Sequence, residues 1–190
     1  MPSRRISLSI PFRDVTASVA PGSIAFLKFQ EEAAGGLQGA VFVTNGIGEP
    51  LEFTFARVDV RASTLWRPGD AHRSAVGQLV RVLFPALSSR PDFLLMLASE
   101  VPPRLFFDDI QLELPACRVG GESSLHAVDE VVEKIDDIQH VFWIGPQPGP
   151  NERARVLMES LRSRNLVTEP FERAVIGLQE AFGNADHVVA

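Results

Sequence analysis

Two pairs of consecutive aspartates are the residues of this chain best suited to metal chemistry. Asp108 and Asp109 precede Glu113, and the sequence Asp-Asp-Ile-Gln that begins at Asp108 recurs at Asp136. Carboxylate oxygens are the ligands that Mg²⁺ takes, and a bound divalent cation can activate water for phosphodiester hydrolysis. Consecutive side chains on a strand nevertheless diverge, and aspartates before apolar strands commonly serve turns. A metal-dependent hydrolase or nuclease that uses Asp108, Asp109 and Glu113 is therefore one hypothesis, and a structural role is the other.

One histidine and the single cysteine are the remaining candidates for acid–base or nucleophilic chemistry. His140 lies beside a predicted strand and close in sequence to the second aspartate pair, which makes it the best candidate for a general acid or base. None of the 4 histidines has the i, i+4 spacing of a helical metal site. Arg118 follows Cys117 and could lower the pKa of the thiol. The competing interpretations are a polar residue on an exposed strand face and an inert, buried thiol.

Two further patterns suggest a functional motif but lack a necessary part of it. Asn45-Gly-Ile-Gly48 suggests a phosphate loop, but the Walker lysine is absent and no helix start follows. Two predicted C-terminal helices suggest a helix-turn-helix, yet the second carries three glutamates and only Arg173 as a basic residue. A recognition helix must tolerate the phosphate charge. Direct contact with nucleic acid is therefore not expected.

Composition narrows the classes of protein that the chain can belong to. With 190 residues, of which 45% are hydrophobic, the chain can bury a core that is stable without disulfides or bound metals. The single cysteine excludes an internal disulfide and a cysteine-rich zinc site, and it favours a reducing compartment. The net charge of −6 opposes broad binding to phosphates. Because there is no secretory h-region and no apolar run of about 20 residues, we expect a cytoplasmic protein without a membrane segment or cofactor.

A β-hairpin is the most secure structural prediction. Residues 37–44 and 51–60 read as two strands joined by an Asn45-Gly46 turn. In the second strand the apolar positions change phase near Ala56, which predicts a bulge or bend at Ala56–Arg57.

The remaining elements follow from periodicity and from helix-capping signals. Strands are predicted near 5–10, 23–29, 93–98, 111–115 and 139–144, in addition to the hairpin strands 37–44 and 51–60. A helix is predicted at 71–87, with Asp70 as its N-cap and Pro85 near its end, and a second helix at 124–134. A helical hairpin is predicted over 151–182, with Asn151 as the cap of its first helix and Asn165 between the two helices. The fold class is α+β, with an antiparallel or mixed sheet.

Pro and Gly divide the chain into three parts. Residues 1–145 form the predicted α+β sheet domain, and 146–150 form a Pro/Gly connector. Residues 151–190 form the helical hairpin and a tail, expected to pack on the same domain.

Three functional hypotheses are consistent with these observations. The first is a non-catalytic interaction or scaffold subunit of a larger cytoplasmic assembly, with a protein partner or in a homo-oligomer. Its candidate interface residues are the aromatic side chains of Trp66, Phe106, Phe107 and Trp143, for which core packing is the competing interpretation. The second is a ligand-sensing module with a pocket between the hairpin sheet and helix 71–87. The third is the hydrolase or nuclease described above, with His140 beside the acidic cluster.

Overall fold

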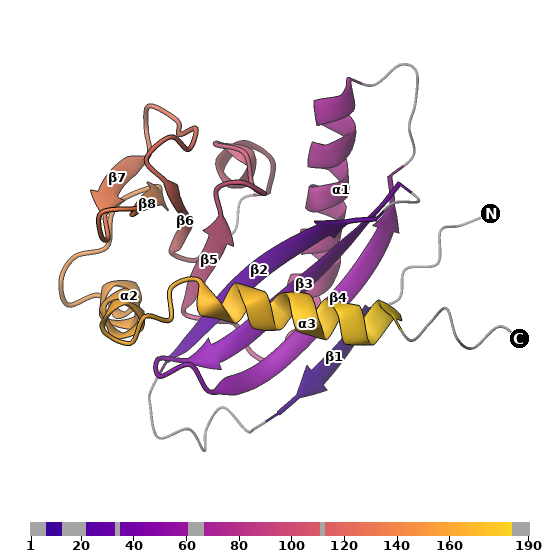
Figure 1. Ribbon diagram of the computed structural model, residues 1–190, viewed down its shortest axis with the longest axis horizontal. Coiled ribbons are helices and arrows are strands. Elements are labelled where there is room, and N and C mark those ends of the chain that lie inside the picture. Colours follow the sequence, from indigo (N-terminus) through magenta and orange to yellow (C-terminus); the bar gives the residue numbers. More distant parts are fainter. Residues whose placement is uncertain (1–6, 13–21, 33–34, 61–66, 111–112, 184–190) are drawn as a thin grey trace, which may run out of the picture.

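The computed structural model describes residues 7–12, 22–32, 35–60, 67–110 and 113–183. Its centre is one sheet of eight strands in the order β1-β4-β3-β2-β5-β6-β8-β7 (Figure 1). The strands are β1 (Ser7–Pro11), β2 (Ser23–Glu31), β3 (Gly36–Asn45), β4 (Pro50–Asp59), β5 (Phe93–Leu97), β6 (Ala116–Gly121), β7 (Val131–Lys134) and β8 (Gln139–Ile144). The predicted α+β class with a mixed sheet is confirmed.

Three neighbouring strands in the middle of the sheet run in the same direction. β2 pairs with β5 in parallel, and β5 pairs with β6 in parallel. All the other pairings are antiparallel, including those of β2 with β3 and of β3 with β4. The carboxyl ends of β2, β5 and β6 therefore meet at one edge of the molecule.

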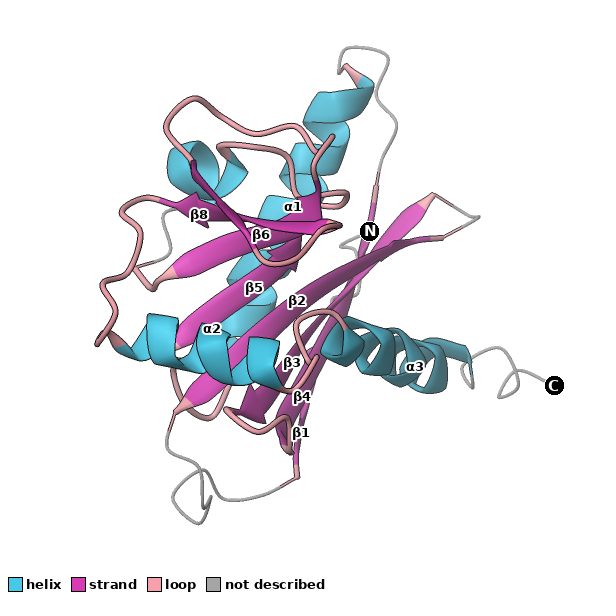
Figure 2. Cartoon of the chain, turned by 60° about the vertical axis from the view of Figure 1, so that its left-hand side comes forward, coloured by secondary structure: helices cyan, strands magenta, loops and turns pink. Residues whose placement is uncertain are grey.

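Helices cover both faces of the sheet. Figure 2 shows α1 (Pro68–Leu83) on one face and α2 (Arg153–Ser163) and α3 (Glu169–Gly183) on the other. Successive residues of β2 alternate between the two layers, so that Phe26 joins the α3-side core and Leu27 the α1-side core. The C-terminal helices thus pack on the sheet of the same chain. Among the described residues, no helix is long and apolar enough to cross a membrane.

The predicted hairpin is present, but its irregularity lies elsewhere. Asn45 Oδ1 closes the turn by accepting the N–H groups of Ile47 at 3.1 Å and Glu49 at 2.9 Å. Pairing is regular through Ala56 and Arg57, whereas the register shifts where Val43 and Thr44 face Glu52 and Pro50. Leu51 is the extra residue, and its side chain joins the α1-side core while Phe53 and Phe55 join the α3-side core. The bulge predicted at Ala56–Arg57 is wrong. Both faces of the sheet are covered, so apolar side chains of β4 can point to either face without an inserted residue.

Two further predicted elements are wrong. The segment 124–134 is not a helix: it crosses a loop and then forms β7, which pairs with β8. The β-branched pair Val131–Val132 fits that ladder. The strand expected at 111–115 lies at Ala116–Gly121, where it pairs with β5 and β8. Residues 111–112 lie outside the described residues.

The helix ends differ from prediction in their caps. α1 is capped by Arg67 rather than Asp70, because Pro68 occupies the first turn, where its fixed φ is favourable. Pro85 ends α1 as predicted, in a 3₁₀ turn at Phe84–Ala86. α2 is capped by Glu152 rather than Asn151, without a side-chain hydrogen bond. Asn165, with φ 56°, adopts the predicted left-handed conformation after α2.

Candidate functional site

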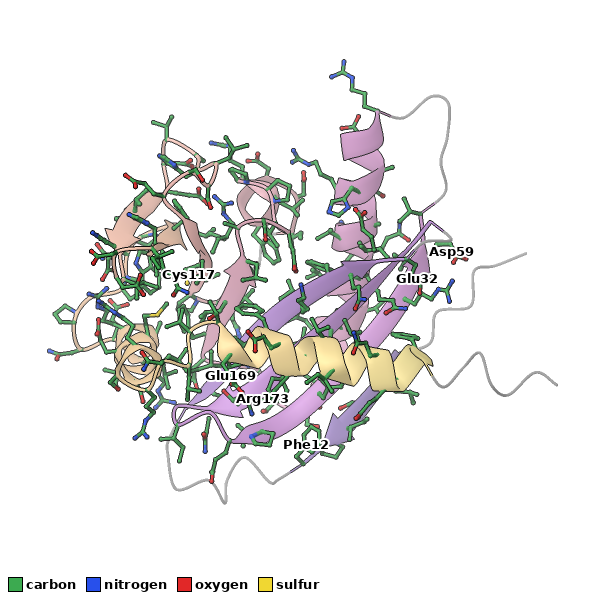
Figure 3. All side chains as sticks on the ribbon, viewed as in Figure 1. Phe12, Glu32, Asp59, Cys117, Glu169 and Arg173 are labelled. Atoms are coloured by element: carbon green, nitrogen blue, oxygen red, sulfur yellow. The ribbon has the colours of Figure 1, made fainter. Side chains whose placement is uncertain are left out.

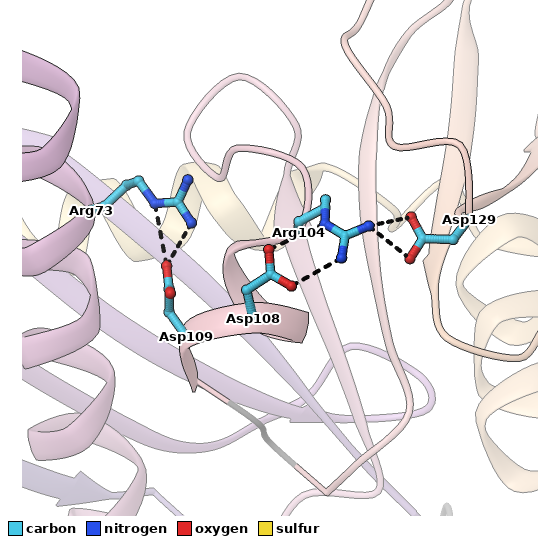
Figure 4. A network of polar contacts seen from close by, with 5 residues as sticks. All are labelled: Arg73, Arg104, Asp108, Asp109 and Asp129. Carbon is cyan, nitrogen blue, oxygen red and sulfur yellow. Dashed lines mark hydrogen bonds and ion pairs between the residues drawn. The ribbon is translucent and has the colours of Figure 1, made fainter.

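Each aspartate of the predicted metal cluster faces an arginine (Figure 4). Both lie in a short π-helical segment, Leu105–Ile110. Arg104 donates to the two oxygens of Asp108 at 3.1 Å, and Arg73 of α1 donates to Asp109 at 2.6 Å. The hydrogen bond from Arg104 lowers the pKa of Asp108. The two carboxylates thus engage separate guanidinium groups on opposite sides.

The other members of the predicted cluster lie on different elements. Glu113 is exposed in the segment that leads to β6. His140 lies on β8 between Gly120 of β6 and Lys134 of β7, and its Nδ1 is buried without a hydrogen-bond partner in the described structure. Within the ranges that the structure describes, no three His, Cys, Asp or Glu side chains are placed to hold a metal ion.

The second aspartate pair shapes the turn between β7 and β8. Asp136 Oδ1 accepts the N–H groups of Ile138 and Gln139, both at 2.8 Å, and these bonds lower the pKa of Asp136. Asp137 pairs with Lys134 at 3.0 Å on the exposed side of the turn. This pair therefore has the structural role that its position before a strand indicates.

Cys117 is an inert thiol by its surroundings. It lies on β6 inside the α3-side core and is fully buried. Burial raises the pKa of the Cys117 thiol well above its ordinary value, and Glu133 adds to this effect, whereas Arg118 opposes it. The net shift is therefore opposite to the one expected from the neighbouring arginine alone.

The aromatic side chains considered as interface anchors lie mostly inside the fold. Trp143 is buried, stacks on Phe93 with ring centroids 5.6 Å apart, and donates its Nε1–H to Glu133 at 3.1 Å. Phe106 is buried in the α1-side core. Trp66 lies outside the described residues, as does the side chain of Phe107. Neither Trp143 nor Phe106 is therefore presented on the surface of this chain.

A groove of about 680 Å³ lies at the carboxyl ends of β2, β5 and β6, and we call it the carboxyl-end groove. Its polar lining comes from Glu31 of β2, His72 of α1, Glu100 and two serines. Glu31 Oε1 lies 3.6 Å from His72 Nδ1. Glu100 is held in place by an ion pair with Lys28 and by the N–H of Phe29, which donates to Oε2 at 2.9 Å. Its complete lining is Phe29, Glu31, Leu37, His72, Ala98, Ser99, Glu100, Pro102, Pro103, Ser124 and Leu125.

A buried arginine ties together the two loops that wall this groove. Arg118 is 0% exposed and forms an ion pair with Glu130 at 2.5 Å. Its Nη1 donates to the carbonyl of Val101 and its Nη2 to the carbonyl of Leu125, both at 3.0 Å. The Val101 loop follows β5 and the Leu125 loop follows β6. The Arg118 guanidinium therefore contacts both walls from inside the core, and the sequence shows it only as a charge between apolar residues.

Close backbone approach completes the wall on the β6 side. A Cβ added at Gly120 would lie 2.8 Å from the Cβ of Ala98 and would collide with the Ser124 hydroxyl. Glycine at this position lets the loop after β6 pack directly on the end of β5.

A second, apolar groove of about 450 Å³ lies between β1, β4 and α3, and we call it the β1–α3 groove. Its floor includes Phe42, Phe53 and Phe55, and α3 forms one wall. Leu8 and Ile10 of β1 pair with Phe55 and Phe53 and so share their face, yet remain exposed. The residues that line the groove are Ile10, Phe12, Phe42, Pro50, Phe53, Phe55, Arg173, Ile176, Gly177, Glu180 and Ala181.

Arg173 and Gly177 set the position of α3 beside this groove. Figure 3 shows Arg173 on α3 and Phe12 beside β1, and both residues line the groove. The guanidinium lies 4.9 Å from the ring centre of Phe42, bonds to Glu169, and donates to the Gly48 carbonyl at 3.0 Å. A Cβ at Gly177 would lie 2.6 Å from Phe53, so that glycine allows α3 to lie this close to β4.

Comparison with known proteins leaves the family open. No family model matches the chain, and no curated protein matches it. Eleven chains of solved structures match. One is Marinitoga piezophila Argonaute in complex with 5′ OH guide RNA and target DNA, at 8% identity and a TM-score of 0.32, over 77% of this chain and 26% of that one. This chain therefore spans about a quarter of that protein's length, and the likeness carries no functional argument.

Proposed function

We propose that this protein is a non-catalytic interaction subunit whose β1–α3 groove binds an amphipathic helix of a protein partner. The observation that carries the proposal is an apolar groove of about 450 Å³ that continues onto exposed apolar residues of β1. Monomeric proteins seldom leave such continuous apolar surface open to water. Covering it would remove that surface from water, which is the main driving force of association.

The lining of the groove favours side-chain docking over the addition of a strand. The N–H of Phe12 donates to the Leu51 carbonyl at 2.8 Å, so the backbone nitrogen of the preceding residue, Pro11, faces away from β4, toward the outer edge of the described sheet. Proline has no N–H to donate, and it commonly protects edge strands from pairing. A partner strand would lose a ladder bond at that point, whereas a partner helix needs no backbone bonds.

The dimensions and the pattern of α3 support a helical partner. The groove side of α3 carries Arg173, Ile176, Gly177, Glu180 and Ala181 at helical spacing. Two strands span about 10 Å across the sheet, which is about the diameter of one helix. A partner helix beside α3 would therefore cover β4 and β1 in the way that α3 covers the strands next to them.

The test compares two exposed apolar residues on two helices. Ile176 in the groove and Val156 on α2 outside it are each 54% exposed, so charges at these positions should affect folding equally little. The tagged chain is used to capture partners from extracts of its source cells, and the recovered partner is purified and titrated against each variant. We expect Ile176→Glu to weaken binding at least about tenfold and Val156→Glu to leave it unchanged.

Hydrogen exchange on the recovered complex locates the contact. Protection of α3 and β1 on binding, with a protected helical segment in the partner, is the expected pattern. Equal effects of the two substitutions, or protection confined to other elements, would contradict the proposal. If the chain associates with itself and Ile176→Glu abolishes that association, the groove binds a second copy of this chain rather than a helix of another protein.

A further inference from the structure

We propose that the carboxyl-end groove is a binding site for a small organic cation, an ammonium group joined to an apolar body. This site is separate from the proposed interaction surface, because the two grooves share no lining residue. At about 680 Å³, the groove is within the size range of small-molecule pockets. It also lies outside the carboxyl ends of parallel strands, where sheets of this kind commonly bind ligands.

The charged residues around the groove favour a positively charged ligand. Glu31 and Glu100 contribute carboxylates, and no lysine or arginine is among the described residues that line the groove. The carboxylate of Glu100 is already matched by Lys28. The Glu31 side chain is 80% exposed. Among the described residues, its one ion-pair partner is His72. Glu31 is therefore the carboxylate available to an incoming ammonium group.

The apolar lining supplies a surface for the body of the ligand. Pro102 and Pro103 lie on the β5 side, and Leu125, which is 80% exposed, lies on the β6 side. A hydrocarbon ring placed between them would remove apolar surface from water on both of its sides. Ser99 and Ser124 add hydroxyl groups that can accept hydrogen bonds from an ammonium group.

Arg118 prepares the groove before any ligand binds. Its bonds to the Val101 and Leu125 carbonyls hold together the two loops that carry the prolines and Leu125. The arginine is buried and paired with Glu130, and the exposed ion pair between Arg104 and Asp129 joins the same two loops at the surface. A ligand would therefore meet walls that are already in place, which reduces the ordering cost of binding.

Three probes with the same ring and different head groups test the site. Benzylamine, benzyl alcohol and benzoate are titrated into the ¹⁵N-labelled full chain at neutral pH, and amide shifts are followed by NMR. We expect saturable shifts of groove-lining residues with benzylamine, weaker shifts with benzyl alcohol and none with benzoate. Glu31→Gln should raise the dissociation constant of benzylamine about fivefold and leave that of benzyl alcohol unchanged.

Two further variants separate the apolar and ionic contributions. Leu125→Ala should raise the dissociation constants of both benzylamine and benzyl alcohol about threefold, because it removes part of the apolar wall. Glu122→Gln, an exposed carboxylate outside the groove, should change neither. The absence of saturable shifts in the groove, equal binding of benzoate and benzylamine, or an unchanged benzylamine constant in Glu31→Gln would overturn the proposal.

Discussion

Glu133 holds the β7–β8 hairpin against α2. Its carboxylate accepts the Trp143 Nε1–H at 3.1 Å and the Gln147 amide at 2.9 Å, and it forms an ion pair with Arg155. Burial alone would raise the pKa of Glu133, but the hydrogen bonds from Arg155 and Trp143 outweigh it and lower the pKa. Three elements therefore depend on one ionised side chain.

The lowered pKa predicts a pH-dependent effect of Glu133→Gln. Because the folded state favours the ionised carboxyl, this stabilisation is fully present above the ordinary pKa of 4.5 and disappears as the pH falls through the lowered value. We expect Glu133→Gln to reduce the free energy of unfolding by about 1–3 kcal/mol at pH 7. Urea unfolding at pH 7 and at successive steps below pH 4.5 should show the difference from wild type becoming smaller.

The exposed Glu122 provides the matched control. Glu122→Gln should stay close to wild type at every pH, since exposed substitutions rarely shift stability by more than about 0.5 kcal/mol. A Glu133→Gln effect of the same size at pH 7 and at the lowest pH would show that the amide disrupts packing rather than an ionic contact.

The charge pattern along the chain indicates which side chains are charged but not which partners they bind. The paired aspartates were identified as candidates, but the arginines that engage them come from α1 and from the loop after β5. Arg104 lies four residues before Asp108, whereas Arg73 is 36 residues away from Asp109, and only the folded chain brings that pair together. The sequence places Arg118 next to Cys117, but a single charge does not indicate which carbonyls it will bind, so its contacts with the two loops are not predicted.

At the scale of elements, two glycines within helices predict opposite effects of the same substitution. Gly177→Ala places a methyl group 2.6 Å from the Phe53 ring, so that ring or α3 must move, which we expect to cost about 1–3 kcal/mol. Gly77→Ala in α1 meets no atom within 4 Å and should stabilise the protein by up to about 1 kcal/mol through helix propensity. Thermal and urea unfolding of the two variants measure both changes. Stabilisation by both substitutions would mean that α3 is free to shift.

Local signals predicted those elements whose own residues determine them. The β3–β4 hairpin was confirmed because Asn45 and its following glycines specify the turn. The segment 124–134 has apolar residues at helical spacing, but the strand ladder with β8 outweighs that local preference. Val128 remains exposed in the preceding loop. Within the segment the β-branched pair Val131–Val132 favours a strand, but the partner strand β8 lies outside it.

At the scale of the whole molecule, the two layers share the central strands. Neighbouring residues of β2 and β5 enter opposite cores, so neither layer can be lost without exposing residues of the same strands. We expect a single unfolding transition. In a Trp66→Phe background, Trp143 fluorescence reports the α3-side core and far-UV circular dichroism reports the whole chain.

A substitution in the opposite layer makes this expectation measurable. Leu79→Ala in the α1-side core should lower stability by about 2–5 kcal/mol and shift the midpoints of both signals together, although Leu79 belongs to a different core from Trp143. Separate midpoints would indicate two independently unfolding layers.

The grooves belong to this scale too, and the sequence did not predict their lining. The hypothesis of a pocket between the hairpin sheet and helix 71–87 names the hairpin strands and α1; β3 and α1 line the carboxyl-end groove through Leu37 and His72, whereas β2, which also lines it, is not part of that hypothesis. The loops after β5 and β6 were not anticipated, because the position of β6 and its parallel pairing with β5 were unknown.

The order of the elements along the chain has a consequence for biosynthesis. The phenylalanines of β2, β3 and β4 emerge from the ribosome early, whereas α3, which covers them, begins only at Glu169. At about 5–20 residues per second, their aromatic face stays uncovered for on the order of ten seconds during translation. We therefore expect chaperones that recognise apolar surface to bind the nascent chain until α3 has been synthesised.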